Sequence, residues 1–406
     1  MLTQLSEFSF VHIADVHLGY EQYNLSERRD DFDRAFMEAV DKIMALKPNF
    51  VIIAGDLFHH ARPLNITLER AIRNFRRLKE ANIPVLVVDG SHDAAPNTLT
   101  STILNPLDSA GLIYYLPRHE NACWENEYCY VYGIPNFRTR ERTEKQLPAF
   151  YELKKPTPRK DKFNIFVFHM ALDMPEITKF YPRIAAEASP ALIPEGFNYY
   201  AGGHIHLPLQ IQFRNGVLAY SGSTETVSYE DAYAEKGFYY VEVDKRFEVK
   251  VSRINIEGTR KFKVVERDCS GLSPHEITEL AEKIVREADE EGAVIVPVLK
   301  GMLPAGSTRG EIDLARIRGA AEKALAVHPV LLLREEEIPE EIIKSIFEGE
   351  IKDLRVKSYE YFLQFFMQRY SREEAEKRAR VALDLMQYLV RGDEDKVREV
   401  LEGLIK

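Results

Sequence analysis

Aspartate and histidine residues with the spacing of a metal site follow the strands that the first half of the chain predicts. The run Asn49–Ala54 is rich in β-branched and aromatic residues, which predicts a buried strand, and Gly55-Asp56 follows it directly. A carboxylate at the carboxyl end of such a strand lies where open α/β sheets bind their ligands. Because its two oxygens can each take a different cation, Asp56 is a candidate for bridging two divalent metals.

Four further windows place candidate ligands at the ends of other predicted strands: Asp15-Val-His17, Gly90-Ser-His92-Asp93, His169, and Gly202-Gly-His204-Ile-His206. In an extended segment, residues two apart point the same way, so both members of an Asp-x-His or His-x-His pair can reach one cation. Of the 11 histidines, those at predicted strand ends or beside Asp56 are His17, His59, His60, His92, His169, His204 and His206. Chance is a poor explanation for such clustering.

The mixture of imidazole and carboxylate groups suits Mn²⁺, Fe²⁺ or Zn²⁺, because it holds no thiolate and too much nitrogen for Mg²⁺ or Ca²⁺. Two such cations about 3.5–4 Å apart clamp a phosphoryl group and hold a hydroxide at neutral pH. Hydrolysis of a phosphoester is therefore the reaction to which these residues are suited. His92 would approach from the side and donate a proton to the leaving oxygen.

The elements that must position these residues alternate between strand and helix in the first half of the chain. After the strand Phe8–Ala14, we expect a helix capped by Ser26 that ends before Pro48, and another helix after Pro63. Pro84–Val88 is another buried strand. Strands separated by amphipathic helices imply βαβ units and parallel pairing.

Strands dominate after about residue 125. They are predicted at Cys129–Gly133, Phe163–Phe168, Tyr199–Gly202, Val217–Ser221, Gly237–Val243 and Phe247–Arg253. Asn215-Gly216 and Asp244-Lys245 are typical of hairpin turns. An α/β protein with a four-layer α/β/β/α sandwich accommodates this order of elements.

A domain boundary is expected near Ile256-Glu-Gly258. The next residues predict a small α+β domain, with strands at Lys261–Arg267, Ala293–Leu299 and Val330–Arg334 and helices at Glu311–Ala326 and after the capping box Ser273–Glu276. From Glu335 an acidic linker leads to short helices with apolar stripes. Those stripes require burial, either against the protein's own domains or, as we prefer, against a partner protein.

Composition limits the class of protein. The 406 residues predict two or three domains, and no apolar run approaches the roughly 18 residues of a membrane span. The first residues lack the pattern of a signal peptide. The three cysteines have neither the spacing of a metal site nor that of a disulfide framework. We therefore expect a cytosolic protein. The net charge of -10 argues against a generally basic nucleic-acid coat. The segment 138–162 is locally basic, either as a DNA contact or as a solvated face.

The windows together resemble the calcineurin-like metallophosphoesterase superfamily. Closer stretches narrow the resemblance to the double-strand-break-repair nuclease subunit of the Mre11 or SbcD type: Asp15–Tyr20, Ala54–His59, Gly203–His206 and Tyr220–Glu225. Strong motifs cover about residues 8–245, and beyond them only the order of domains is similar.

This resemblance implies a manganese-dependent nuclease with exonuclease action on duplex ends and endonuclease action on single strands. By motif position, one Mn²⁺ would be held by Asp15, His17, Asp56 and His206. The other would be held by Asp56, His169 and His204. The catalytic proton donor would be His92, with His59 as a supporting residue near the phosphate and Tyr20 as a nucleotide contact.

The resemblance also implies an order of domains and a set of partners. Residues 1–256 would form the nuclease domain, 257–335 a capping domain that contacts DNA, and 336–406 a linker with helices that bind a coiled-coil ATPase of the Rad-fifty or SbcC type. A nucleoid-associated cytoplasmic homodimer is expected, with 65–82 and 97–111 as candidate dimer segments.

The sequence departs from the family at one expected ligand, since Ser91 stands where the family has Asn. A hydroxyl is about one bond shorter than an amide oxygen, so we expect a weaker second metal site and reduced activity. Serine as a harmless substitute is the alternative. Two other functions stay open: a weakened paralogue that mainly bridges DNA and the ATPase, and a phosphodiesterase acting on a small molecule.

Overall fold

The computed structural model describes residues 7–95, 101–180, 185–304, 306–335, 351–367, 369–391 and 394–405. The chain forms two compact units, Met1–Phe262 and Lys263–Lys406. Each unit is described by itself.

The first unit contains two six-stranded mixed sheets. The first sheet has the order β12-β11-β1-β2-β3-β4, with β1 Phe8–Ile13, β2 Phe50–Ala54, β3 Val85–Val88, β4 Tyr114–Tyr115, β11 Gly237–Val243 and β12 Val249–Asn255. The second has the order β5-β6-β7-β8-β10-β9, with β5 Cys123–Glu125, β6 Cys129–Gly133, β7 Phe163–His169, β8 Tyr199–Gly203, β9 Leu209–Phe213 and β10 Gly216–Tyr220. Pairing is parallel from β1 to β4, and again through β6, β7, β8 and β10.

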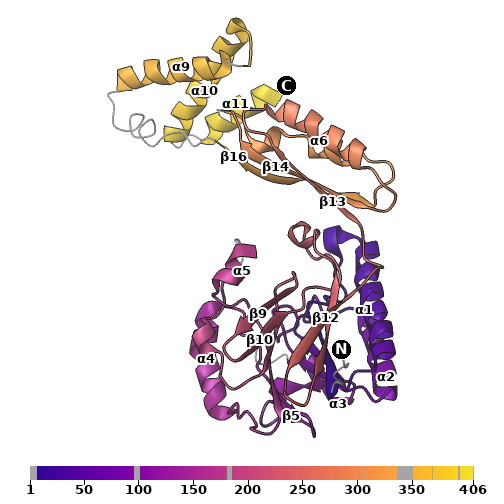
Figure 1. Ribbon diagram of the computed structural model, residues 1–406. Helices are drawn as coiled ribbons and strands as arrows, with labels where there is room; N and C mark the ends of the chain where they lie inside the picture. Colours follow the sequence, from indigo (N-terminus) through magenta and orange to yellow (C-terminus); the bar gives the residue numbers. More distant parts are fainter. Residues whose placement is uncertain are drawn as a thin grey trace. The chain divides into compact units, whose positions relative to one another are not determined.

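Helices cover the outer faces of the two sheets. Figure 1 shows α1 (Ser26–Leu46) and α2 (Asn65–Glu80) on one side of this unit and α4 (Arg140–Leu153) on the other, with the strands between them. The shorter helices are η1 Gln22–Asn24, α3 Leu104–Ser109, η2 Leu116–Arg118, α5 Pro175–Phe180, η3 Pro190–Leu192 and η4 Tyr229–Asp231.

The burial of β2 explains its continuous apolar sequence. Phe50, Ile52 and Ala54 belong to the core between the two sheets, whereas Val51 and Ile53 belong to the core beneath α1 and α2. A strand buried on both faces has no reason to alternate polar and apolar residues. A third core fills the space between the second sheet and α4. The resulting order of layers is helix, sheet, sheet, helix.

Most expected elements of this unit are present, but one helix cap differs and several elements were not predicted. Ser26 is the first residue of α1 and not its cap, because Leu25 takes that place without a side-chain hydrogen bond. The elements β4, β5 and α4 were not predicted, nor was β9, which pairs with β10 across a turn at Arg214 and the predicted Asn215. Since Leu209–Phe213 alternates apolar residues with glutamine, the signal for β9 was present.

The second unit contains a four-stranded sheet in which β14 is central. Its strands and helices are β13 Phe262–Asp268, α6 Pro274–Ala288, β14 Val294–Met302, η5 Arg309–Glu311, α7 Leu314–Arg318, β15 Ala326–Val327 and β16 Val330–Arg334. The predicted capping box at the start of α6 is confirmed, because Ser273 and Glu276 each bind the other's backbone N–H.

The prediction of a helix at Glu311–Ala326 is wrong. Only Leu314–Arg318 is α-helical, and Gly319 follows as its C-cap. The carboxylate of Asp289 accepts hydrogen bonds from the backbone N–H groups of 322–324, at 2.9–3.2 Å. Those N–H groups would otherwise bond within a helix, so the Asp289 cap fixes the following residues as a loop instead.

Beyond residue 350, the described residues form three helices: α9 Ile351–Met367, α10 Arg372–Arg391 and α11 Glu394–Ile405. In α10, Ala375, Ala379 and Leu383 are buried, whereas Val356 and Met367 of α9 are 57% and 49% exposed. Most of the expected acidic linker lies outside the described residues. Among the residues that the structure describes, no helix combines the length and the apolar composition that a bilayer span requires.

Candidate metal centre

The carboxyl ends of strands from both sheets converge on Asp56. Asp15, Asp56 and His169 offer ligand atoms that all lie within 4.8 Å of one another. His169 Nε2 lies 3.1 Å from Asp56 Oδ2 and 4.0 Å from Asp15 Oδ1, and all three side chains are buried.

A second group shares Asp15. The ligand atoms of Asp15, His17 and His206 also lie within 4.8 Å of one another. His206 Nε2 is 3.9 Å from Asp15 Oδ1, and His17 Nε2 is 3.8 Å from Asp56 Oδ2. The two groups therefore adjoin, as two neighbouring cations with a shared carboxylate would require.

The backbone at these residues is not extended. Asp15, His17 and Asp56 have φ angles of 53°, 50° and 49°, in the left-handed region that residues other than glycine rarely adopt. The sequence-based expectation that Asp15 and His17 converge by strand alternation is therefore wrong in its reason, although their side chains do converge. Such strained residues cluster at functional sites, where the surrounding structure holds them.

Close approach of neighbouring backbone segments explains two glycines of the motifs, Gly203 where the two sheets meet and Gly90 between the loops after β2 and β3. A Cβ atom on Gly203 would lie 1.9 Å from the carbonyl oxygen of Ala54, and one on Gly90 would lie 2.1 Å from Asp56 Oδ1. Any side chain at either position would push β8 or the loop after β3 away from Asp56. Glycine therefore allows the carboxyl ends to meet.

Hydrogen bonds to the second ring nitrogen orient two histidines of the centre. Nδ1 of His169 lies 2.8 Å from the carbonyl oxygen of Ala54, and Nδ1 of His206 lies 3.1 Å from Asp231 Oδ2. Both oxygens can only accept, so each Nδ1 is the donor and each Nε2 faces the carboxylates. Nε2 of His169 and of His17 is buried without a hydrogen-bond partner in the described part of the chain. A ring nitrogen that faces carboxylate oxygens needs either a proton or a metal cation between them, so these residues fit divalent metals.

The electrostatics of His169 support the same conclusion. Burial acts to lower its pKa, but Asp56 and Asp15 outweigh burial and raise the pKa to about 10. The same attraction holds the pKa of Asp56 well below its usual range, although burial opposes this. A proton on His169 thus occupies a place that a divalent cation can take, and metal binding would release it.

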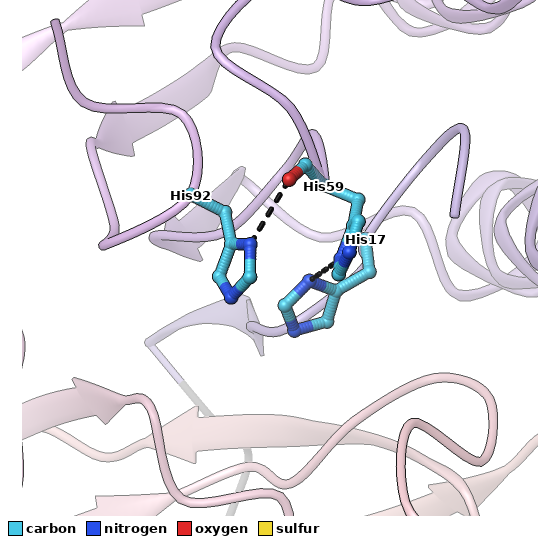
Figure 2. Close-up of side chains that lie close together, drawn as sticks. All are labelled: His17, His59 and His92. Atoms are coloured by element: carbon cyan, nitrogen blue, oxygen red, sulfur yellow. Dashed lines mark hydrogen bonds between the residues drawn. The ribbon is translucent and has the colours of Figure 1, made fainter. Parts of the chain in front are cut away.

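His92 lies on the open side of the centre. Its backbone N–H donates to Asp56 Oδ1 at 2.8 Å, and its Nδ1 lies 2.9 Å from the carbonyl oxygen of His59. Figure 2 shows His92, His59 and His17 together, with His59 Nδ1 3.2 Å from His17 Nδ1. The ring of His59 stacks on His92 and on Tyr20, with centroids 4.5 Å and 3.7 Å apart. Burial, together with His92 and His60, lowers the pKa of His59 to about 3.

Two expected contributors lie at the edge of the groups. Ser91 Oγ donates to Asp56 Oδ2 at 3.3 Å. The backbone N–H of His204 donates to Asp15 Oδ1 at 3.0 Å, and its ring nitrogen Nε2 lies 3.6 Å from Glu187 Oε2. Burial lowers the pKa of His204 to about 3, so its ring is neutral. Among the described residues, the close groups of histidine and carboxylate ligand atoms do not contain His204.

The supporting role of two carboxylates beside the centre was not predicted from the sequence. Asp93 accepts from the backbone N–H of Leu57 at 2.7 Å and of Gly90 at 2.6 Å, which ties the loops after β2 and β3 together. Burial raises the pKa of Asp93 to about 8. Asp231, beside His206, stays a carboxylate because Lys236 and His206 lower its pKa against the effect of burial. The only available signal for Asp231 was the capping-box spacing from Ser228.

Part of the basic segment 138–162 is occupied by partners within the protein. Arg140 pairs with Glu144 and Asp173, while Arg159 and Lys162 both pair with Glu125. In the described part of the chain no ion pair involves Arg142, Lys145, Lys155 or Lys160. The surface is less basic than its sequence suggests.

Comparison with known proteins connects this geometry to a family. A model of the calcineurin-like phosphoesterases matches residues 8–208, which include every residue of the two ligand groups. The chain is 30% identical over 383 residues to the DNA double-strand break repair protein Mre11 of Archaeoglobus fulgidus, an alignment that covers 88% of this chain and 78% of that protein.

Two further relatives carry the same name. The Mre11 protein of Methanococcus maripaludis is 34% identical over 266 residues, covering 61% of this chain and 67% of that protein. That of Methanocaldococcus jannaschii is 35% identical over 244 residues, covering 57% of this chain and 62% of that protein. In the first relative the similarity extends well beyond the phosphoesterase region.

Proposed function

Because this chain belongs to the Mre11 family of DNA double-strand break repair proteins, within the calcineurin-like phosphoesterases, we propose that it is a metal-dependent DNA nuclease. It would act as an exonuclease on duplex ends and as an endonuclease on single strands. The observation that carries this proposal is the pair of adjoining His/Asp groups at Asp56, in which histidine Nε2 atoms face carboxylates.

The proposed metals are two Mn²⁺ ions, in keeping with mixed imidazole and carboxylate ligands. One would be held by Asp15, His17, Asp56 and His206. The other would be held by Asp56, His169 and His204. When bound, two such cations polarise the phosphoryl group and lower the pKa of a coordinated water.

His92 is the proposed proton donor. With Nδ1 engaged by the carbonyl oxygen of His59, its Nε2 is directed to the open side, where it can give a proton to the leaving oxygen. The stack of Tyr20, His59 and His92 holds that ring in place, and we assign Tyr20 itself to a nucleotide contact.

The remaining parts of the chain fit the handling of DNA and a partner. We propose 1–256 as nuclease domain, 257–335 as capping domain with DNA contacts, and 336–406 as the segment that binds a coiled-coil ATPase. Exposed apolar residues of α9 support that last assignment. The lysines and arginine of 138–162 that form no ion pair in the described part of the chain are suited to bind DNA phosphates. Helix α2, in which Ile66 is 41% exposed, is a candidate surface for a homodimer.

A second candidate function is supported by Ser91. As a weakened paralogue, the protein would mainly bridge DNA and the ATPase, because Ser91 stands where the family has Asn and hydrogen-bonds to Asp56. A phosphodiesterase for a small molecule is less well supported, since the similarity to DNA repair proteins extends beyond the phosphoesterase region.

A nuclease assay separates these functions. With Mn²⁺, the full chain should shorten linear duplex DNA and cut hairpin loops, and His92→Ala should slow both by about 10²–10⁴-fold through loss of general acid catalysis. DNA binding without cutting by the unaltered protein would support the bridging role. Cleavage that survives in His92→Ala at the full rate would contradict the assigned proton donor.

A further inference from the structure

A buried carboxylate outside the proposed ligand set contacts the ring of His206. His206 follows β8 in a loop and its side chain is 23% exposed, so core packing alone does not fix the ring. Nδ1 of the ring lies 3.1 Å from Asp231 Oδ2, and Nε2 lies 3.9 Å from Asp15 Oδ1. Asp231 therefore meets one edge of the ring, while the other edge faces the candidate metal centre.

Asp231 is itself held by several donors. It ends η4, and its carboxylate accepts from the backbone N–H groups of Val227 and Ser228, both at 3.3 Å. Lys236 Nζ lies 3.1 Å from Asp231 Oδ1 and donates to the backbone carbonyl of Asp231 at 2.8 Å. Because Asp231 and Lys236 are both buried, this acceptor cannot easily turn away from His206.

The same segment also fixes the backbone of His206. Ser223 N donates to the carbonyl oxygen of His206 at 3.1 Å, and Lys236 Nζ donates to Ser223 Oγ at 3.2 Å. Residues 223–236 thus contact His206 at two points, one on the main chain and one on the ring.

We propose that Asp231 is a positioning residue of the metal centre: its carboxylate accepts a hydrogen bond from Nδ1–H of His206 and so directs Nε2 toward Asp15. This inference rests on the proposed metal-dependent function. Metal-bound histidines usually donate their other ring N–H to a carboxylate or a carbonyl, which fixes tautomer and orientation, and loss of that partner typically costs 10–100-fold in metal affinity.

A purely structural role for Asp231 predicts something different. The Asp231–Lys236 pair would then only close the segment 223–236, and removing either partner would have the same effect. Lys236→Met is the matched control, because it removes a buried partner of Asp231 but leaves the contact between Asp231 and His206.

The experiment compares the full chain with its Asp231→Ala, Asp231→Asn and Lys236→Met variants. Mn²⁺ titration followed by electron paramagnetic resonance gives affinity and stoichiometry. Asp231→Ala should weaken the binding of one of the two ions by about 10–100-fold. Asp231→Asn, which keeps an acceptor, should weaken it less. Lys236→Met, which removes one donor to Asp231 but keeps the contact between Asp231 and His206, should also weaken it less than Asp231→Ala does. The second measurement is the NMR spectrum of metal-free protein labelled at histidine. A signal from an exchange-protected Nδ1 proton of His206 should appear in the unaltered chain and in Lys236→Met, but not in Asp231→Ala.

Two outcomes would overturn the inference. Either Asp231→Ala binds both ions as the unaltered protein does, or Lys236→Met loses as much affinity as Asp231→Ala. An unaltered protein that binds no Mn²⁺ would instead refute the proposed function, which keeps the two failures distinguishable.

Discussion

At the scale of single residues, three histidines of the centre are oriented by the oxygen atom that their Nδ1 contacts. His169 meets the carbonyl oxygen of Ala54, His92 that of His59, and His206 the carboxylate of Asp231. A carbonyl or carboxylate partner makes Nδ1 the donor, so Nε2 is left to bind a metal or to exchange a proton with substrate. The chemistry proposed for each ring follows from this assignment.

Ser91 provides a direct test of one ligand position. Its hydroxyl hydrogen-bonds to Asp56, whereas an asparagine amide oxygen would extend about one bond further. We expect Ser91→Asn to tighten the weaker Mn²⁺ by about 10-fold, by analogy with other changes around metal ligands, and to raise the nuclease rate. Calorimetric Mn²⁺ titration and the DNA cleavage assay measure the two effects.

Ser91→Ala is the control for that substitution, because it removes the hydroxyl without adding a ligand. It should not raise the rate. Two tightly held Mn²⁺ ions in the unaltered protein would contradict the idea that Ser91 weakens a site.

The burial of His12, a residue of β1 outside the proposed ligand set, should make the free energy of unfolding depend on pH. Burial lowers its pKa to about 3, and its Nδ1 lies 2.9 Å from the hydroxyl of Tyr199. The unfolded chain binds a proton below about pH 6.5 while the folded chain does not, so stability falls as pH falls from 6.5 toward 3, by about 1.4 kcal/mol per pH unit for one proton. Between pH 7.5 and 5, His12→Gln should lose about 2 kcal/mol less stability than the unaltered protein.

Urea unfolding of the metal-free protein at the two pH values measures this difference. Other groups titrate in both proteins, so only the difference between them reports on His12. Equal pH dependence of the stability of the two proteins would show that the pKa of His12 is the same in the folded and the unfolded state.

At the scale of elements, the meeting of two strand ends from different sheets forms the centre. The carboxyl end of β8 approaches that of β2 so closely that only glycine fits at position 203. Gly203→Ala should destabilise the first unit by about 1–3 kcal/mol through overpacking and should also weaken Mn²⁺ binding. The fluorescence of Trp124, the only tryptophan and a residue of β5, follows unfolding of this unit.

Gly310→Ala is a matched substitution in open space, where the nearest atom to an added Cβ is Thr308 Oγ1 at 3.8 Å. It should leave the Trp124 transition unchanged. A Gly203→Ala protein with unchanged stability and unchanged Mn²⁺ affinity would show that the strand ends can separate without cost.

The sequence predicted elements well where periodicity and local chemistry agreed. β6, β11 and β16 have the predicted bounds, and the parallel pairing of β1, β2 and β3 is as expected. The helix predicted at 311–326 failed because the decisive partner, Asp289, lies far away in sequence. No local pattern reveals such a cap.

The same reasoning applies to the centre. Its windows were recognisable because each combines ligand residues with a strand end, and Asp15, His17, Asp56, His169 and His206 do come together. Asp93 and Asp231 were missed as supporting residues because their role depends on which loops meet in space. The left-handed backbone of Asp15 and His17 was likewise invisible in the sequence, which reads as a simple continuation of β1.

At the scale of the whole molecule, a phosphoesterase unit is joined to a second unit that has its own core. The similarity to Mre11 proteins covers most of the chain, and the exposed apolar residues of α9 are the basis for the proposed partner segment. The assignment of a function to each part depends on whether the first unit is a metal-dependent catalyst.

A crystal structure of the protein soaked in saturating Mn²⁺, with anomalous data collected at the manganese edge, tests that premise most directly. The account predicts two peaks beside Asp56 about 3.5–4 Å apart, one in contact with Asp15, His17 and His206 and the other with His169 and His204. An empty site at Asp56, or manganese bound only elsewhere on the molecule, would contradict it.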